Sequence, residues 1–303
     1  MAHFPLALGT LNFGKRTSEA DAKPIVHRAL DSGIRLFDTA NAYHEGESER
    51  MLGRLLKGQR DRVEIATKVG FGRIGGKPEG LAPERIRASL DESLERLATD
   101  RVDLYYLHVP DYATPVEATL EAMQRVLETG KARAWGVSNF ASWQILEMMH
   151  IADRTGMPRP AVSQQMYNTL IRQLDIEYFK FTQRYPIHTT VYNPLAGGLL
   201  SGAPGKRFEK NTMYQRRYLS EAMLRATSRL GDVAKAAGMT LVTLAYRWII
   251  GRPGVDSILV GPGSFQHLDD ALAACTGALD DEVRAKADAI WLEMSGTEAT
   301  YTR

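Results

Sequence analysis

Cysteine is nearly absent from this 303-residue chain, which contains only Cys275. A single thiol cannot form an internal disulfide, so packing must hold the fold together, and this usage fits a reducing cytoplasm. Cys275 lies in the apolar stretch ALAACTGAL, which indicates a small core side chain rather than a nucleophile.

The sequence also lacks long hydrophobic runs and blocks of one charge. No stretch approaches the ~18 apolar residues of a bilayer span, and MAHFPLALGT does not resemble a secretion signal. The net charge of +2 comes from 38 basic and 36 acidic residues that are interspersed. We therefore expect no membrane and no nucleic-acid partner. Because no Pro/Ser/Gly-rich linker divides the chain, we expect residues 1–303 to form a single domain.

Short apolar stretches are abundant, and amphipathic stretches separate nearly all of them. Eight βα units in about 260 residues predict a closed parallel (β/α)8 barrel, with an open doubly wound sheet as the alternative. The predicted strands are 6–11, 34–38, 62–69, 102–109, 132–138, 161–165, 187–193 and 256–261.

Apolar spacing of three and four residues predicts the helices, and Gly33, Gly130 and Gly156 mark the ends of three of them. The four tryptophans are expected to pack in strands and helices. Residues 196–220 form the one long irregular segment, typical of a lid over the barrel, and 280–294 an extra helix before a tail. The other predicted helices are 19–33, 48–57, 83–97, 115–130, 142–156 and a stretch around 175–185.

Polar residues stand at the ends of successive predicted strands. The carboxyl ends of barrel strands converge on one mouth, and buried polar groups need partners, so this is not a core pattern. The residues at these ends are Asp38, Lys68, His108, Ser138, Asn139, Gln164, Tyr192 and Asn193.

Two local motifs suggest sites that we do not favour. In FDTANAYHEGESE, Asp38 and His44 are six residues apart and no second histidine has ligand spacing, so we expect no metal. In GFGRIG (70–75), the dinucleotide fingerprint is followed by Gly and Pro where a helix should begin, which favours a flexible loop near substrate. We expect a solvated loop and an acidic helix start at His44, Glu45, Glu47 and Glu49.

A catalytic unit is a better interpretation of Asp38, Tyr43, Lys68 and His108. A phenol has an ordinary pKa of ~10, and a neighbouring cation would lower it. A carboxylate would hold the lysine in place, and the histidine can orient a carbonyl oxygen. This set suits the donation of a proton to a developing alkoxide while hydride arrives from a nicotinamide.

At these residues the sequence resembles the aldo-keto reductases over positions 1–273. The motifs are FDTANAY (37–43), ATK (66–68), YLH (106–108), GVSNF (136–140), QQMYN (164–168) and YNPLAGGLLSG (192–202). Within the family, PDYATPVEATL (110–120) and a terminal arginine resemble the aflatoxin-aldehyde/succinic-semialdehyde reductase branch.

The resemblance implies roles for individual residues. Tyr43 would be the proton donor, Lys68 would lower its pKa, Asp38 would pair with Lys68, and His108 would orient the carbonyl. Ser138, Asn139 and Gln164 would hold the nicotinamide carboxamide, and Tyr192 would stack on its ring. The remaining cofactor-binding candidates are Gly9, Thr10 and Asp38, then Asn193, Leu195, Gly197 and Ser201 along the pyrophosphate, then Gly261, Ser264, His267 and Asp270 at the adenosine end.

The adenosine segment GPGSFQHLDDA (261–271) departs from the family pattern. A basic residue or Gln usually stands at His267 and an asparagine at Ala271. NADPH is the expected cofactor, with a reduced margin over NADH, because neutral histidine recognises a 2′-phosphate less well than arginine.

The resemblance also suggests partners and alternatives. The expected partner is a small-molecule carbonyl, with Arg217 and Arg303 approaching its anionic groups, and the chain is expected to be a monomer or homodimer. A cofactor-binding, redox-sensing regulatory subunit is the alternative, because potassium-channel β subunits share this fold. A short-chain dehydrogenase is discarded because no tyrosine has a lysine four residues later.

Overall fold

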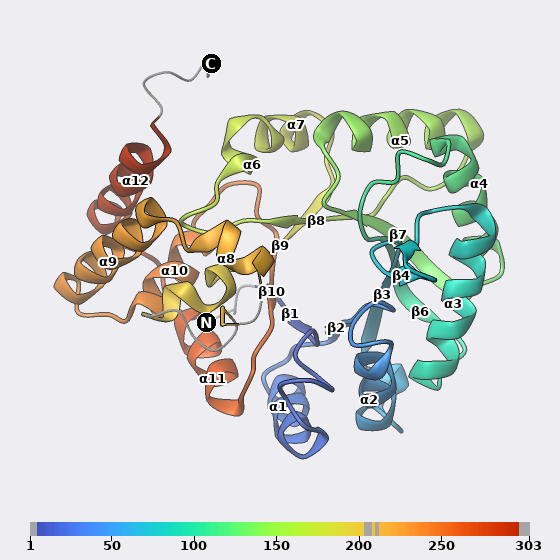
Figure 1. The fold of residues 1–303 in the computed structure, drawn as a ribbon, viewed down its shortest axis with the longest axis horizontal. Helices are drawn as coiled ribbons and strands as arrows, with labels where there is room; N and C mark the ends of the chain where they lie inside the picture. The colour runs from blue at the N-terminus through green and yellow to red at the C-terminus, as the bar shows by residue number, and fades with distance from the viewer. Residues whose placement is uncertain (1–4, 203–207, 210–211, 297–303) are drawn as a thin grey trace.

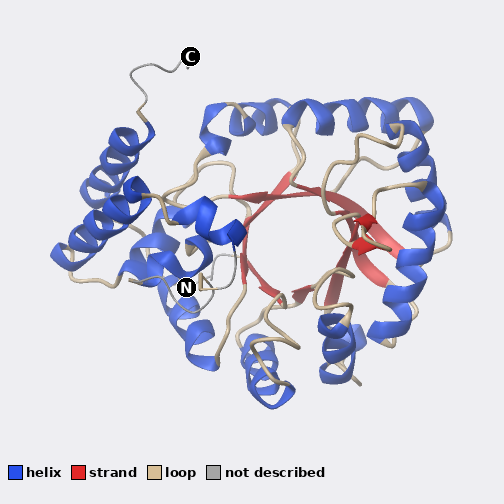
Figure 2. Cartoon of the chain, in the orientation of Figure 1, coloured by secondary structure: helices blue, strands red, loops and turns tan. Residues whose placement is uncertain are grey.

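The computed structural model describes residues 5–202, 208–209 and 212–296. Within them, eight parallel strands close into a barrel in the order β1-β10-β9-β8-β7-β6-β3-β2, the ring at the centre of Figure 2. The predicted (β/α)8 barrel is confirmed, and the open sheet is wrong. Its strands are β1 (Leu6–Gly9), β2 (Leu36–Asp38), β3 (Glu64–Val69), β6 (Val102–Leu107), β7 (Ala132–Ser138), β8 (Val162–Met166), β9 (His188–Tyr192) and β10 (Ser257–Val260).

The strand register brings the polar strand ends side by side. Asp38 pairs with Gly9 on one side and Ala66 on the other, two residues before Lys68. On the far side of the ring, Ser138 pairs with Gln164. Side chains separated by 126 residues can therefore meet at one edge.

Helices surround the ring, as Figure 1 shows. They bury their apolar faces against the strands, as a sheet closed on itself requires. The helices are α1 (Glu19–Asp31), α2 (Glu47–Leu55), α3 (Pro83–Leu97), α4 (Val116–Glu128), α5 (Ser142–Thr155), α6 (Gln173–Ile176), α7 (Tyr178–Arg184), α8 (Thr212–Tyr218), α9 (Glu221–Ala236), α10 (Leu241–Ile250), α11 (Phe265–Ala274) and α12 (Asp281–Ser295), with 3₁₀ turns η1 (Arg60–Arg62) and η2 (Ala196–Ser201).

Local backbone chemistry sets the helix ends as expected. Gly33, Gly130 and Gly156 have φ of +88°, +72° and +72°, the left-handed conformation in which a side chain is strained. Cys275 is buried, and burial raises the pKa of its thiol to about 12, as suits a core position. Trp135 and Trp248 are fully buried.

Two expectations about the outer segments need correction. Trp143 does not pack inside, because it lies at the start of α5 on its outer side and is 62% exposed. The segment 196–220 is not irregular throughout, since η2 and α8 form within its described part. The 70–82 loop contains an antiparallel ribbon of β4 (Arg73–Ile74) and β5 (Lys77–Pro78), and α3 starts only at Pro83, so the rejected dinucleotide fingerprint indeed has no helix start.

No single helix in the described ranges has the length and apolar composition of a membrane span. The bent pair α9 and α10 passes that test only when the two are joined across a 92° bend.

Candidate functional site

Asp38 and Lys68 form a fully buried ion pair at the ends of β2 and β3. The Lys68 ammonium also donates to the Thr39 carbonyl oxygen at 2.7 Å, and the Gln164 amide donates to the second Asp38 oxygen at 2.9 Å. Burial lowers the pKa of Lys68, and Asp38 opposes that effect most strongly. Side chains from β2, β3 and β8 thus meet at the Asp38 carboxylate.

Tyr43 follows β2 on the loop that leads to α2. The Lys68 ammonium lies 5.4 Å from the centre of its ring. Burial, and then the Asp38 charge, raise the pKa of Tyr43 well above its ordinary value. The expected lowering by Lys68 is therefore wrong for the protein alone, because the ammonium is turned onto Asp38 and Thr39. The phenol remains protonated through neutral pH.

His108 lies just beyond β6, with its ring centre 5.8 Å from that of Tyr43 in an edge-on arrangement. Burial, and then the Lys68 charge, lower the pKa of His108 well below its ordinary value, so the imidazole is neutral. Its Nδ1 is buried with no protein partner among the described residues. Phe71, on the loop before β4, covers the other side of the ring with centres 5.0 Å apart.

Asn139, directly after β7, is bonded to residues at the ends of β6 and β9. Its amide nitrogen donates to the His108 carbonyl oxygen at 2.9 Å and to the Ser138 hydroxyl at 3.0 Å. Its amide oxygen accepts from the Tyr192 hydroxyl at 2.6 Å. These bonds hold Asn139 in a left-handed conformation with φ +66°, which asparagine tolerates better than most residues.

The segment after β9 turns sharply on Asn193, which has φ +64°. The Gly197 backbone nitrogen donates to the Asn193 side-chain oxygen at 2.6 Å, and the Asn193 amide donates to the Tyr218 hydroxyl at 2.5 Å. Leu195 is half-buried and Ser201 is exposed, with its hydroxyl on the Gly198 carbonyl oxygen. The four residues expected along a pyrophosphate therefore share one short run.

The adenosine-end candidates cluster at the start of α11. Ser264 caps the helix by accepting from the His267 backbone nitrogen at 3.3 Å, and His267 and Asp270 are exposed. Gly261 is held by the Asn12 amide, which donates to its carbonyl oxygen at 3.0 Å. Ala271 is fully buried in the core, so it offers no polar group to a ligand.

Gly9 and Thr10, at the end of β1, are buried. A Cβ at Gly9 would lie 3.2 Å from the Leu259 side chain. The Thr10 hydroxyl is buried against the Asp38 carbonyl oxygen at 3.1 Å and the Ser48 hydroxyl at 2.8 Å. The structure therefore ties Thr10 to the loop carrying Tyr43.

The expected solvated start of α2 is wrong for Glu49, which is fully buried. Its carboxylate accepts from the Thr67 hydroxyl and from the Arg96 guanidinium, each at 2.5 Å, and these bonds offset the loss of water. His44 is half-buried and bonds the Leu11 carbonyl oxygen at 2.6 Å. Only Glu45 of the expected set is fully exposed.

Of the two arginines expected to approach the substrate, the structure describes Arg217 but not Arg303. Arg217 lies on α8, and its charge opposes the burial that raises the pKa of Tyr192 to about 12. Its guanidinium carbon is 6.0 Å from the centre of the Tyr218 ring. Arg303 lies outside the described residues.

Several residues at the rim were missed by sequence reasoning. Phe71 and Tyr214 stand in loops or helices whose placement no local pattern reveals, and Tyr214 acts on the pKa of Tyr43. Tyr106 is different, because it stands in β6, two residues before His108. Its ring centre lies 5.4 Å from the Lys68 ammonium, so strand alternation could have placed it inside the barrel.

The rim residues fit a nicotinamide dinucleotide. A carboxamide needs both a donor and an acceptor, and Ser138, Asn139 and Gln164 present a hydroxyl and two amides on adjacent strands. At Gly198, a Cβ would meet no atom within 4 Å, which leaves room for a phosphate to approach the backbone.

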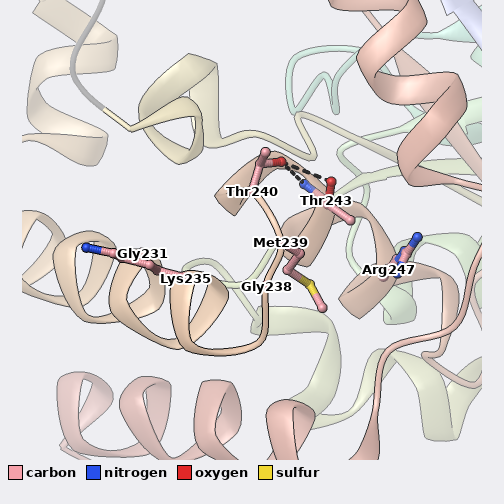
Figure 3. Close-up of a pocket in the computed structure, with 7 residues that line it drawn as sticks. All are labelled: Gly231, Lys235, Gly238, Met239, Thr240, Thr243 and Arg247. Carbon is pink, nitrogen blue, oxygen red and sulfur yellow. Dashed lines mark hydrogen bonds between the residues drawn. The ribbon is translucent and has the colours of Figure 1, made fainter.

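Other parts of the surface offer less. The described residues contain no group of three or more His, Cys, Asp or Glu arranged to hold a metal ion. A hollow of about 580 Å³ lies between α9 and α10 on the outer layer, away from the strand ends (Figure 3). Its lining residues, such as Lys235 and Thr243, include no site candidate.

Comparison with known proteins gives consistent matches. Residues 5–292 match the model of the Aldo/keto reductase family. Human Aldo-keto reductase family 7 member A3 is 35% identical, covering 88% of this chain and 87% of that protein. Human Aflatoxin B1 aldehyde reductase member 2 is 36% identical, over 88% of this chain and 80% of that protein. The Arabidopsis thaliana Probable voltage-gated potassium channel subunit beta is 33% identical, over 87% of this chain and 84% of that protein.

Proposed function

This chain belongs to the aldo/keto reductase family and is an oxidoreductase that acts on carbonyls; from that premise we propose that Tyr43 delivers the proton in a nicotinamide-dependent reduction of aldehydes and ketones to alcohols. The observation that carries the proposal is the convergence of Tyr43, His108 and the Asp38–Lys68 pair at one end of the barrel. The bound nicotinamide supplies a hydride to the carbonyl carbon.

Tyr43 is the proton donor in this proposal. Burial keeps its pKa high, so the hydroxyl holds its proton at neutral pH until an alkoxide develops beside it. The Lys68 ammonium, 5.4 Å from the ring centre, then stabilises the phenolate that remains. Asp38 keeps that ammonium in place.

His108 orients the substrate. Its pKa is lowered by burial, so a neutral imidazole faces the reaction and can donate one N–H to the carbonyl oxygen. A neutral donor polarises the carbonyl without competing with Tyr43 to deliver the proton. Phe71 packs against the imidazole, with ring centres 5.0 Å apart.

We propose NADPH as the cofactor, held by Ser138, Asn139, Gln164 and Tyr192 at the nicotinamide. NADH stays an alternative, because exposed His267 and buried Ala271 provide no fixed cation for a 2′-phosphate. Two human relatives are named as aldehyde reductases or aldo-keto reductases, which supports an aldehyde substrate. Arg217 would attract an acidic group on it.

Replacement of the phenol tests the proposal. Tyr43→Phe should lower kcat for aldehyde reduction by about 10²–10⁴-fold, the usual contribution of a positioned proton donor, while cofactor binding persists. Tyr112→Phe is the matched control, because it makes the same change on an exposed side chain. Turnover measured by nicotinamide absorbance decides the matter, and undiminished activity in Tyr43→Phe would exclude this donor.

A redox-sensing subunit is the second candidate, favoured by the 33% identity to the plant channel-subunit relative. Stopped-flow mixing of the reduced cofactor complex with a panel of aldehydes separates the two functions. Tight cofactor binding without oxidation by any aldehyde would favour the sensor over the reductase.

A further inference from the structure

The loop that carries Tyr43 continues in an unusual backbone conformation. His44, Glu45 and Gly46 have φ of +52°, +55° and +80°, so three residues in a row are left-handed. For residues with a side chain this conformation is strained, and it persists only where the surroundings enforce it. The source of that enforcement must lie in the contacts of the loop and of the first turn of α2.

Glu49 is the centre of those contacts. It is fully buried, and each of its carboxylate oxygens has one partner, the Thr67 hydroxyl or the Arg96 guanidinium. Arg96 comes from α3 and packs directly on Gly46, where a Cβ would lie 2.4 Å from the arginine side chain. Gly46, the last of the three left-handed residues, is thus held against Arg96, the partner of Glu49.

Ser48 fixes the same turn from the other side. Its hydroxyl lies 2.8 Å from that of Thr10 and 3.1 Å from that of Thr39. The Thr39 carbonyl oxygen in turn accepts a hydrogen bond from the Lys68 ammonium. The first turn of α2 is therefore joined by buried hydrogen bonds to residues adjacent to both Asp38 and Lys68.

We propose that Glu49, through Arg96 and Thr67, is a positioning residue that fixes Tyr43 against Lys68 and His108. Thr67 immediately precedes Lys68 on β3, so Glu49 spans the strand that bears the lysine and the loop that bears the phenol. This inference rests on the proposed role of Tyr43 as proton donor.

Stability alone does not account for such a pair. A buried ion pair contributes little more than a well-packed apolar pair of the same volume, since both charges lose their water. Geometric specificity is what the charged pair adds, because the guanidinium nitrogen and the hydroxyl each constrain one oxygen. That specificity lies beside the reacting groups.

Glu49→Gln tests the proposal, because it keeps the side-chain volume and removes the charge. We expect the single-turnover rate of hydride transfer to fall by about tenfold or more, with the KM for aldehyde and the Kd for cofactor changing by less than about threefold. The matched control is Asp103→Asn, since Asp103 pairs with Arg60 at 2.7 Å at the opposite end of β3 and β6 and its side chain is only 9% exposed. That control should lose stability without losing rate.

A double variant separates positioning from stability. In Glu49→Gln/Arg96→Met no guanidinium is left without its carboxylate, so Tm should recover relative to Glu49→Gln. The rate of hydride transfer should stay low, because no Glu49–Arg96 pair holds the loop that carries Tyr43. Recovery of the rate together with Tm would overturn the proposal, as would an unchanged rate in Glu49→Gln.

Failure of the proposed function gives a different result. In that case the unaltered protein does not oxidise the cofactor with any aldehyde, or Tyr43→Phe retains full activity. The inference about Glu49 fails by itself when Tyr43→Phe is inactive and Glu49→Gln transfers hydride at the rate of the unaltered protein.

Discussion

At the scale of single residues, the Lys68 ammonium is held by charge and by aromatic rings together. The rings of Tyr43 and Tyr106 have their centres 5.4 Å from it, and Asp38 pairs with it directly. Burial favours the neutral amine, whereas the carboxylate and the negative faces of the rings favour the cation. Asp38 thus maintains a charge that the barrel interior would otherwise suppress.

His267 provides a prediction about cofactor choice. Exposed on the first turn of α11, it has room for a longer side chain. His267→Arg should raise kcat/KM for NADPH relative to NADH by about tenfold, because a guanidinium binds a 2′-phosphate in two places. Initial rates with both cofactors measure the change.

The control for cofactor choice is Gln266→Arg, which adds the same charge one position away, where Gln266 already bonds Asp270. Equal gains in both variants would mean that charge alone, and not the position of His267, sets the preference.

Which site positions could be predicted depends on how each residue is placed. Asp38, Lys68 and Gln164 each lie near the carboxyl end of a predicted strand, and a closed barrel then brings strand ends together. Glu49 could not be predicted as buried, because an acidic residue in a first helical turn normally faces water. Its burial depends on Arg96, 47 residues later, which no local pattern links to it.

At the scale of elements, a largely buried charge cluster is one of the contacts that attach α12 to the rest of the protein. Arg172 is almost fully buried, lies 4.1 Å from the centre of the Trp248 ring and pairs with Asp288 of α12 at 2.5 Å. Asp288→Ala should lower the free energy of unfolding by about 2–4 kcal/mol, because a buried guanidinium loses its partner. Urea titration measures it.

The comparison variant is Glu293→Ala, on the same helix. Glu293 pairs with Arg229, and both side chains are about half exposed. It should leave stability unchanged. If both variants lose the same amount, the docking of α12 does not depend on the buried cluster.

The strands could be predicted because continuous apolar runs between turns have few other uses in a parallel sheet. All eight predicted runs overlap a strand, and seven of them contain it whole. The segment 196–220 could not, because η2 depends on Gly197 and Gly198 in left-handed conformations and α8 packs its Tyr214 over Gly197. Such contacts arise only after the barrel has formed.

At the scale of the whole molecule, closure of the sheet joins its first and last strands. β1 pairs with β2 and with β10, so the first and last strands are neighbours. Because the strands form a closed ring, the chain cannot be divided into two parts that each have a complete sheet. We therefore propose that residues 1–303 form one domain.

The pH dependence of stability follows from the buried imidazole. An unfolded histidine has a pKa of ~6.5, whereas burial holds that of His108 well below this value. Below pH ~6.5, His108 therefore binds a proton in the unfolded chain but remains unprotonated in the folded chain. Stability should fall as the pH drops from ~6.5 to ~5, with a slope on the order of 1 kcal/mol per pH unit.

The variant His108→Gln isolates this effect, since glutamine does not titrate. The other histidines of the described strands and helices, His27, His150, His188 and His267, are exposed, and His44 in the loop before α2 is half-buried. Carboxylates with lowered pKa such as Asp111 protonate only at lower pH. Urea titrations at pH 5.0, 6.0 and 7.0 should show the slope in the unaltered protein and lose most of it in His108→Gln. An equal slope in both would assign the acid sensitivity to groups other than the histidine at the barrel mouth.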